Sequence, residues 1–400
     1  MSDSSSADAK FLPPQQNPLL TRLIQSICYP LAYLLYKICL VVDEEDVAKL
    51  KEISDRRIVY LPNHSNLDDG IVMFLLSARI GQLFNYVVAY EAFQGWIGKL
   101  MQKVGAYSIR RGVGDRYSIV QTLKTLQQPQ CKLVIFPEGG CSYQNETVIP
   151  FRSGAVELSF KAIAKLVKQH DIIPDFYLVP VSLNYYYPDA TDAQIDRALN
   201  RLEQALSLKS EGDLYSRLRN IGQRVLGDLE IEYGVTSQDS DLDKRIDSLR
   251  TIMLNYCEHK LKIDPVIKLP DRERIYKIQH ILSQLSDSER QPGIDYEHIY
   301  LTTVRLLNFD ALYDGYVAEK PTPERFFDTI DRLEREVFKI DRPKFKGRRR
   351  VVAKIGTPIN LKEYWSDYHQ NNSANNKSSR QHIIDDLTAK AQQMVQANLN

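Results

Sequence analysis

The stretch from residue 57 to about residue 183 alternates short apolar, β-rich runs with segments whose apolar residues recur at helical spacing. Five of the runs predict strands, at Ile58–Leu61, Phe84–Ala89, Ala106–Ile109, Lys132–Phe136 and Phe176–Leu183. Three segments between them predict helices, at Ile71–Ala78, Arg116–Leu126 and Ala155–Val167. Because parallel strands are joined by such crossover helices, we expect an α/β fold with a mostly parallel central sheet flanked by helices.

The chain changes character after this stretch and then returns to it. Long, charged, helix-period segments predict a large helical insertion over residues 189–349, with helices at 193–208, 214–226, 241–261, 271–286 and 323–338. A strand that completes the sheet is expected at Arg350–Ile359 or at Leu229–Val235, and we favour the later one because Gly356 and Pro358 make the sharper turn. A polar loop over 367–379 and a helix at 383–397 follow. The α/β domain thus comprises residues 43–188 and 350–400.

The N-terminal region divides into a polar tail and an apolar stretch. Residues 1–16 are rich in Ser, Asp, Pro and Gln, and we expect a disordered tail without a signal peptide. Residues 17–42 are apolar but are interrupted by Arg22, Gln25 and Lys37 and divided by Pro30, so they are too short to span a bilayer. They predict two amphipathic helices at the membrane interface, or helices that pack on the domain's own core.

The amino-acid composition indicates the cellular compartment and argues against nucleic acid as a ligand. Five cysteines without Cys-x-x-Cys spacing favour a reducing compartment, and a formal net charge of +1 lacks the basic footprint of nucleic-acid binders. We therefore expect a protein on the cytoplasmic face of a membrane that contacts lipids and not nucleic acid. The oligomeric state stays open.

A histidine and an acid follow the first predicted strand. His64 and Asp69 lie in Asn63-His64-Ser65-Asn66-Leu67-Asp68-Asp69, directly after the apolar run that ends at Leu61. Ligands of open α/β sheets bind at the carboxyl ends of strands, so a proton acceptor with an orienting carboxylate there indicates a catalytic site.

Arginines also lie next to two other predicted elements, after a strand and before a helix. Arg110 and Arg111 end the strand Ala106–Ile109, before Gly112, and a guanidinium suits bidentate binding of phosphate or carboxylate. Arg152 precedes the helix predicted at Ala155, where backbone amides also favour an anion. Solvated surface arginines are the alternative at each position.

Two further motifs complete the set. The strand at Lys132–Phe136 runs into Pro137-Glu138-Gly139-Gly140, which places a carboxylate among glycines at a strand end. The last strand contains Val179-Pro180-Val181, and because proline cannot donate to a strand ladder, Pro180 predicts an edge or a bulge.

In this order, the motifs resemble those of the glycerolipid and lysophospholipid acyltransferase family. The resemblance rests on His64 with Asp69, Gly105 through Arg111, Phe136 through Gly139, and Val179 through Val181. It covers about residues 19–187 and resumes at 351–359.

The resemblance implies transfer of a fatty acyl group from a thioester to a hydroxyl of glycerol 3-phosphate or a lysophospholipid, foremost lysophosphatidic acid, in phospholipid biosynthesis. His64 is then the general base and Asp69 its orienting acid, with no covalent nucleophile. The substrate-binding residues would be Arg110, Arg111, Glu138, Gly139 and Arg152 on the acceptor side and Pro180 on the acyl-donor side. No cofactor or metal is implied, and acyl-CoA or acyl carrier protein supplies the acyl group.

Two departures from the family stand out. Gly140-Cys141-Ser142 lacks an arginine that many members carry there, which bears on the identity of the acceptor. The helical insertion is unusually large and is expected to be a lid, a membrane-facing collar, a partner surface or a structural annex. Five basic residues near its end either face anionic lipid or are solvated: Lys344, Lys346, Arg348, Arg349 and Arg350.

Two other functions remain open at this point. A metal-dependent ester hydrolase would use His64, Asp69 and Glu138 as ligands, although the other six histidines lie outside the motifs. A catalytically inactive lipid-binding protein of the same fold is the second alternative.

Overall fold

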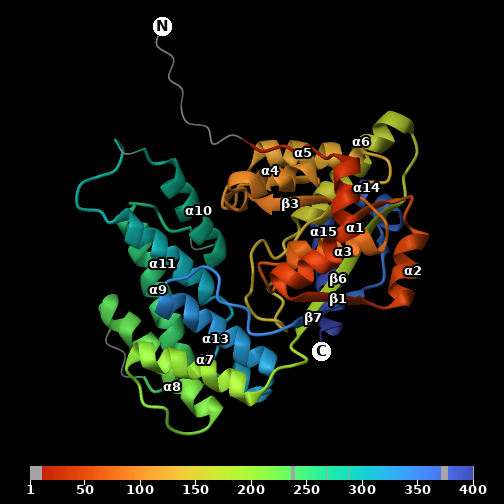
Figure 1. The fold of residues 1–400 in the computed structure, drawn as a ribbon. Helices are drawn as coiled ribbons and strands as arrows, with labels where there is room; N and C mark the ends of the chain where they lie inside the picture. Colours follow the sequence, from red (N-terminus) through yellow and green to blue (C-terminus); the bar gives the residue numbers. More distant parts are fainter. Residues whose placement is uncertain (1–10, 236–238, 267, 287, 371–376, 400) are drawn as a thin grey trace.

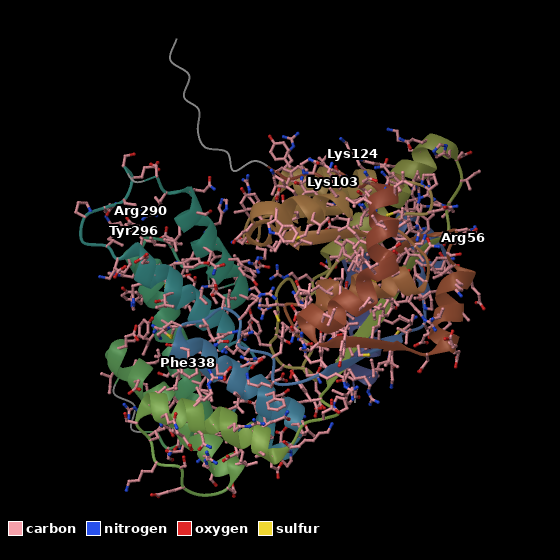
Figure 2. The ribbon with its side chains drawn as sticks, viewed as in Figure 1. Arg56, Lys103, Lys124, Arg290, Tyr296 and Phe338 are labelled. Carbon is pink, nitrogen blue, oxygen red and sulfur yellow. The ribbon has the colours of Figure 1, made fainter. Side chains whose placement is uncertain are left out.

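The computed structural model describes residues 11–235, 239–266, 268–286, 288–370 and 377–399. Its elements form two groups, a sheet with helices on both sides and a cluster of helices next to it (Figure 1). In Figure 2 the labelled side chains of Arg56, Lys103 and Lys124 lie on the sheet-containing part, and those of Arg290 and Phe338 lie on the helical part.

A twisted sheet of eight strands forms the centre of the first part. Its strand order is β1-β7-β6-β2-β5-β3-β4, with β8 paired to β6 off this path. Strands β2 to β6 all run in one direction, whereas β7 and β8 are antiparallel to β6 and β1 is parallel to β7. The strands are β1 Ile38–Val42, β2 Arg57–Pro62, β3 Asn85–Ala89, β4 Ala106–Ile109, β5 Lys132–Val134, β6 Phe176–Tyr186, β7 Arg349–Ile355 and β8 Ile359–Asn360. The expected mostly parallel sheet flanked by helices is confirmed.

Helices cover both faces of the sheet because successive residues of a strand point to opposite sides. Ile58 and Tyr60 of β2 pack in a core shared with α1, α2 and α3, whereas Val59 and Leu61 pack in a core shared with α5, α6 and α15. The helices of this part are α1 Pro18–Tyr36, α2 Glu44–Glu52, α3 Asp69–Arg79, α4 Gly95–Lys103, α5 Arg116–Gln127, α6 Gly154–His170, α14 Trp365–Gln370 and α15 Lys377–Ala397. The three helices predicted between the strands are α3, α5 and α6, and α2 and α4 were not predicted.

The N-terminal region differs from our expectation in two ways. Pro30 does not divide the apolar stretch, because α1 is one helix with Pro30 inside it. Pro30 and Ser26, whose carbonyl loses its helical donor, both lie on the exposed side of the helix, where water can serve the carbonyl. The end of the predicted interface segment is not helical, because Ile38–Val42 forms strand β1. In the described part of the chain, no helix is both long enough and apolar enough to cross a membrane.

Residues of the predicted tail pair with the domain. Backbone N–H groups of Leu12 and Gln15 donate to the Ser108 hydroxyl and the Gln102 carbonyl, at 3.0 and 2.9 Å, and the Phe11 ring stacks on Tyr117. The expectation of disorder is therefore wrong for residues 11–16, and residues 1–10 lie outside the described part.

The helical part lies between β6 and β7 in the sequence and has a core of its own. Its helices are α7 Asp192–Leu206, α8 Leu214–Glu232, α9 Leu242–Lys260, α10 Asp271–Gln284, α11 Tyr296–Asn308, α12 Gly315–Glu319 and α13 Pro323–Phe338. The alternative strand at Leu229–Val235 is wrong because α8 continues to Glu232, and the favoured segment supplies β7 and β8. The domain boundaries that we assign stay a prediction.

Two C-terminal predictions need adjustment. Part of the predicted polar loop is α14, and residues 371–376 of that loop lie outside the described residues. The last helix begins at Lys377, before the predicted residue 383.

Candidate active site

The sequence motifs meet at one edge of the sheet. Because β2 to β6 are parallel, their carboxyl ends lie at the same edge. The segments that leave β2, β4 and β5 carry His64, Arg110 with Arg111, and Glu138. The helical part lies along this edge, next to the loop that follows β5 (Figure 1).

His64 and Asp69 form a direct pair. Nδ1 of His64 lies 2.9 Å from Oδ2 of Asp69, which begins α3 and is fully buried, whereas the His64 side chain is 21% exposed. The same Oδ2 accepts the Asn66 backbone N–H at 2.8 Å, and Oδ1 accepts the Tyr185 hydroxyl at 2.5 Å. The structure therefore brings the two predicted residues together and shows that the carboxylate is held from both sides.

This arrangement fixes the tautomer of the imidazole. A carboxylate that accepts two other donors requires a proton on the histidine nitrogen that faces it, so in the neutral ring Nδ1 carries the hydrogen and Nε2 has the lone pair. The His64 ring also packs against Phe136, with 4.5 Å between ring centroids. Nε2 is thus the atom that can take a proton from a bound hydroxyl.

Tyr185 is a member of the site that the motifs did not reveal. Burial, and secondly the charge of Asp69, raise the pKa of Tyr185 well above its ordinary value, so that the hydroxyl remains a hydrogen-bond donor. Its signal in the sequence was weak, because only the pairing of β6 next to β2 brings residue 185 close to the start of α3.

Glu138 is buried between two backbone donors. Its Oε1 accepts the His64 backbone N–H at 2.6 Å and its Oε2 accepts the Ile149 backbone N–H at 2.9 Å. The residue is 1% exposed, and burial raises its pKa to about 8. Glu138 thus holds the backbone of the His64 loop, and its role in binding the acceptor stays a prediction.

Gly139 and Arg152 lie against each other. Gly139 has φ +71°, and a Cβ there would lie 2.4 Å from the guanidinium carbon of Arg152. The positive φ favours glycine here, and a larger residue would also require the Arg152 guanidinium to move. The Arg152 Nη1 is 2.6 Å from a carboxylate oxygen of Glu273 on α10.

The two arginines after β4 point to different neighbours. Arg111 donates from Nη1 to the Tyr276 hydroxyl at 3.0 Å and lies over that ring, whereas Arg110 lies over the ring of Tyr90. Arg111 and Arg152 therefore share Tyr276 as a neighbour, with 6.0 Å from Arg152 to the ring centroid. Arg110 is not part of this group.

The backbone at Gly112 is in close contact with the helical insertion. A Cβ on Gly112, which has φ +76°, would lie 2.4 Å from the backbone of Tyr276 and Lys277. Helix α10 of the insertion thus packs directly on the turn after β4. The insertion is in contact with the candidate site, which its sequence did not reveal.

Pro180 is not at a sheet edge, so that alternative of the prediction is wrong. It pairs with Leu61 of β2 and lies where the other neighbour of β6 changes from β8 to β7. Its carbonyl accepts the Gly356 N–H at 2.9 Å on that side. A missing donor is tolerated at this change of partner, because no ladder bond from residue 180 is needed there.

The basic cluster near the end of the insertion is held by acids. Arg349 is 2% exposed and lies 2.7 Å from Asp68, Lys346 contacts Asp331 and Glu334, and Arg348 contacts Asp189. Arg349 and Lys346 are therefore enclosed in ion pairs within the protein, whereas Arg348 forms a pair at the exposed surface, as a solvated charge can. Among the residues with described placement, no group of three or more His, Cys, Asp or Glu is arranged to hold a metal ion.

The fold and the site together define an α/β domain with a histidine–aspartate pair at the carboxyl edge of a parallel sheet. Residues 40–184 match the family model described as Acyltransferase. This match supports the acyltransferase family for the α/β part, and with it an enzyme that transfers acyl groups. No curated protein matches the chain.

Proposed function

We propose that this protein is a membrane-associated O-acyltransferase that moves a fatty acyl group from a thioester to a hydroxyl of glycerol 3-phosphate or a lysophospholipid. Lysophosphatidic acid is the acceptor that we favour, and phospholipid biosynthesis is the expected setting. The observation that carries the proposal is the 2.9 Å contact between His64 Nδ1 and a carboxylate that is itself fully buried.

The acid–base chemistry follows from that contact. A hydroxyl is a weak nucleophile near neutral pH, so attack on a thioester needs a base at the moment the new bond forms. His64 Nε2 would take the hydroxyl proton, and the fixed charge of Asp69 would stabilise the resulting imidazolium. The thioester C–S bond then breaks, and the leaving thiolate takes the proton from His64, so that free thiol is released and no covalent acyl-enzyme is required.

The nearby arginines support an acceptor that carries phosphate. Arg111 and Arg152 converge on one side of the site, and each presents a planar set of donors suited to phosphate oxygens. In the absence of such a ligand, their partners are the carboxylates of Glu91 and Glu273.

Helix α1 supports attachment to a bilayer. Its inner side buries Thr21, Gln25, Cys28 and Ala32 against the domain. Its outer side exposes large apolar residues in a continuous row, with Leu19 83% and Leu34 64% exposed; the others are Leu23, Ile27, Leu31 and Leu35. An amphipathic helix of this kind lies in the plane of the headgroups with its apolar side in the acyl region.

The activity is tested with purified full-length protein and a matrix of acyl-CoA and acyl carrier protein donors against glycerol 3-phosphate and lysophospholipid acceptors, read by the mass of the product. We expect one phosphate-bearing acceptor to dominate. His64→Ala should lower turnover by about 10² to 10⁴ while vesicle binding is retained. A wild-type enzyme that hydrolyses esters but transfers no acyl group, or an unchanged rate in the variant, would disprove the proposal.

Membrane attachment is tested separately by sedimentation with vesicles that contain anionic lipid. The double substitution Leu23→Glu and Leu34→Glu should lower vesicle binding by at least about tenfold, because each leucine contributes on the order of 1 kcal/mol when it is partly buried in lipid. Ile231→Glu is the matched control, since Ile231 is 79% exposed but lies on α8 of the insertion. Equal losses in the two variants would argue against α1 as the attachment surface.

A further inference from the structure

Helix α10 contributes side chains to the arginine side of the candidate site. A Cβ on Gly140 would lie 2.1 Å from the Tyr276 hydroxyl and 2.6 Å from Arg272 Nη1, so both groups rest on the backbone that follows Glu138 and Gly139. Tyr276 is also the shared neighbour of Arg111 and Arg152. Arg272 therefore belongs to the same cluster of cations, although it lies 120 residues farther along the chain than Arg152.

Arg272 is buried and only partly satisfied. It is 7% exposed; its Nε lies 2.7 Å from Asp310, and its Nη2 donates to the Cys141 carbonyl at 3.2 Å. Its Nη1 has no hydrogen-bond partner among the described residues. Arg111 is in a similar state, since its buried Nε likewise has none within the described part of the chain.

Buried donors of this kind are uncommon in folded proteins, because leaving one unsatisfied costs free energy that a partner would recover. Here two guanidinium groups beside one tyrosine each have such a donor. This pair of donors is suited to bind an oxyanion, which offers several acceptor oxygens. Asp310 fixes Arg272 through Nε and Nη2 and leaves Nη1 directed at Gly140. The arginine is thus preorganised to bind a ligand rather than to pair with a second carboxylate.

We propose that Arg272 of the helical insertion binds the phosphate of the acyl acceptor, together with Arg111 and Arg152. This inference rests on the proposed function and assigns the insertion a role in choosing the acceptor. The Gly140-Cys141-Ser142 segment has no cationic side chain of its own, and Arg272 brings one to it from α10. The ligand chemistry is a phosphate monoester, as in glycerol 3-phosphate or lysophosphatidate.

The test is a calorimetric titration of the full-length protein with glycerol 3-phosphate, with inorganic phosphate and with glycerol as separate probes. Arg272→Gln should weaken glycerol 3-phosphate binding by about 10- to 100-fold, the range expected for a lost charge-assisted hydrogen bond. Arg274→Gln is the matched control, because Arg274 lies on the same helix in a comparably buried pair with Glu258, at 2.7 Å, and faces α9. It should bind as the wild type does.

Several results would overturn the assignment. These are equal affinity in Arg272→Gln and wild type, equal losses in the Arg272 and Arg274 variants, or inorganic phosphate bound as tightly as glycerol 3-phosphate, which would identify a site for free phosphate. If Arg272→Gln does not fold by circular dichroism, Arg272→Lys carries the test, and it should lose several-fold in affinity because it keeps the charge but not the planar donors.

Binding and turnover separate this inference from the proposed function. A wild-type protein that binds glycerol 3-phosphate through Arg272 but transfers no acyl group would refute only the function. An active enzyme whose KM for lysophosphatidate is unchanged in Arg272→Gln would refute only the role of Arg272.

Discussion

Asp69→Asn offers the sharpest test of the histidine–aspartate pair, because the surroundings dictate how the amide must lie. Oδ2 of Asp69 accepts from both His64 Nδ1 and the Asn66 backbone N–H, so the amide oxygen must take that place. The amide nitrogen then faces Tyr185, whose hydroxyl can rotate and accept. The variant should therefore keep the tautomer and the position of the imidazole.

What the variant loses is the negative charge opposite the imidazolium that forms during attack. A hydrogen bond to a charged group contributes roughly 1.5–3 kcal/mol, which corresponds to a fall in kcat of about 10- to 150-fold. We expect KM for the acceptor to change by less than about threefold, since the substituted group holds the base and not the ligand.

The assay is the steady-state release of free thiol from the acyl thioester at saturating acceptor. Asp68→Asn is the matched control, because Asp68 is also buried but pairs with Arg349 and Arg342. It should unfold at a lower temperature while keeping kcat within a few-fold. A fall of 10⁴ or more in Asp69→Asn would show that the tautomer was lost, and no fall, or an equal fall in Asp68→Asn, would remove Asp69 from the mechanism.

Two further predictions concern charges around the site. Burial raises the pKa of Asp328 to about 7, so between about pH 4 and pH 7 the folded protein binds a proton that the unfolded chain has lost. The free energy of unfolding should therefore fall as the pH rises through this range, by at most about 1.4 kcal/mol per pH unit. Urea unfolding at several pH values should show a shallower slope in Asp328→Asn, and an identical slope would contradict this source. Glu273→Gln removes a carboxylate that competes with the acceptor phosphate for Arg152. The variant should lower KM for a phosphate-bearing acceptor several-fold without changing KM for the thioester. An increase in the acceptor KM would show that Glu273 helps to bind the acceptor.

Local patterns in the sequence predicted the elements that carry the catalytic residues, because each pattern lies within a few consecutive residues. The strand before His64 and the strand Ala106–Ile109 lie where the apolar runs placed them, and Asp69 begins a helix within hydrogen-bonding distance of His64. The parallel direction of the strands then brings their ends to one edge, whatever the order of the strands.

Contacts between segments far apart in the sequence could not be predicted from local patterns. The position of Pro180 beside a change of strand partners depends on where β7 and β8 attach, and nothing near residue 180 specifies that. Tyr185 reaches Asp69 only because β6 lies next to β2. The sequence around Arg272 and Tyr276 predicts only a charged helix. Their place beside the site depends on the packing of α10 on Gly112 and Gly140.

The insertion contributes to the geometry of the base as well as to the arginine side. The backbone of His64 is held at both ends by the segment after β5, because its N–H donates to Glu138 and its carbonyl accepts the Ser142 N–H at 2.7 Å. The Ser142 carbonyl in turn accepts from Arg332 of α13, a buried arginine that also donates to backbone carbonyls within the insertion. Two hydrogen bonds therefore connect the His64 backbone to α13, one from the Ser142 N–H to the His64 carbonyl and one from Arg332 to the Ser142 carbonyl. Because a buried donor that loses its acceptor costs about 1–3 kcal/mol, a break between Arg332 and the Ser142 carbonyl would be unfavourable. The insertion and the catalytic loop should therefore keep their relative positions during the reaction, so that α10 presents Arg272 to the acceptor while His64 acts on its hydroxyl.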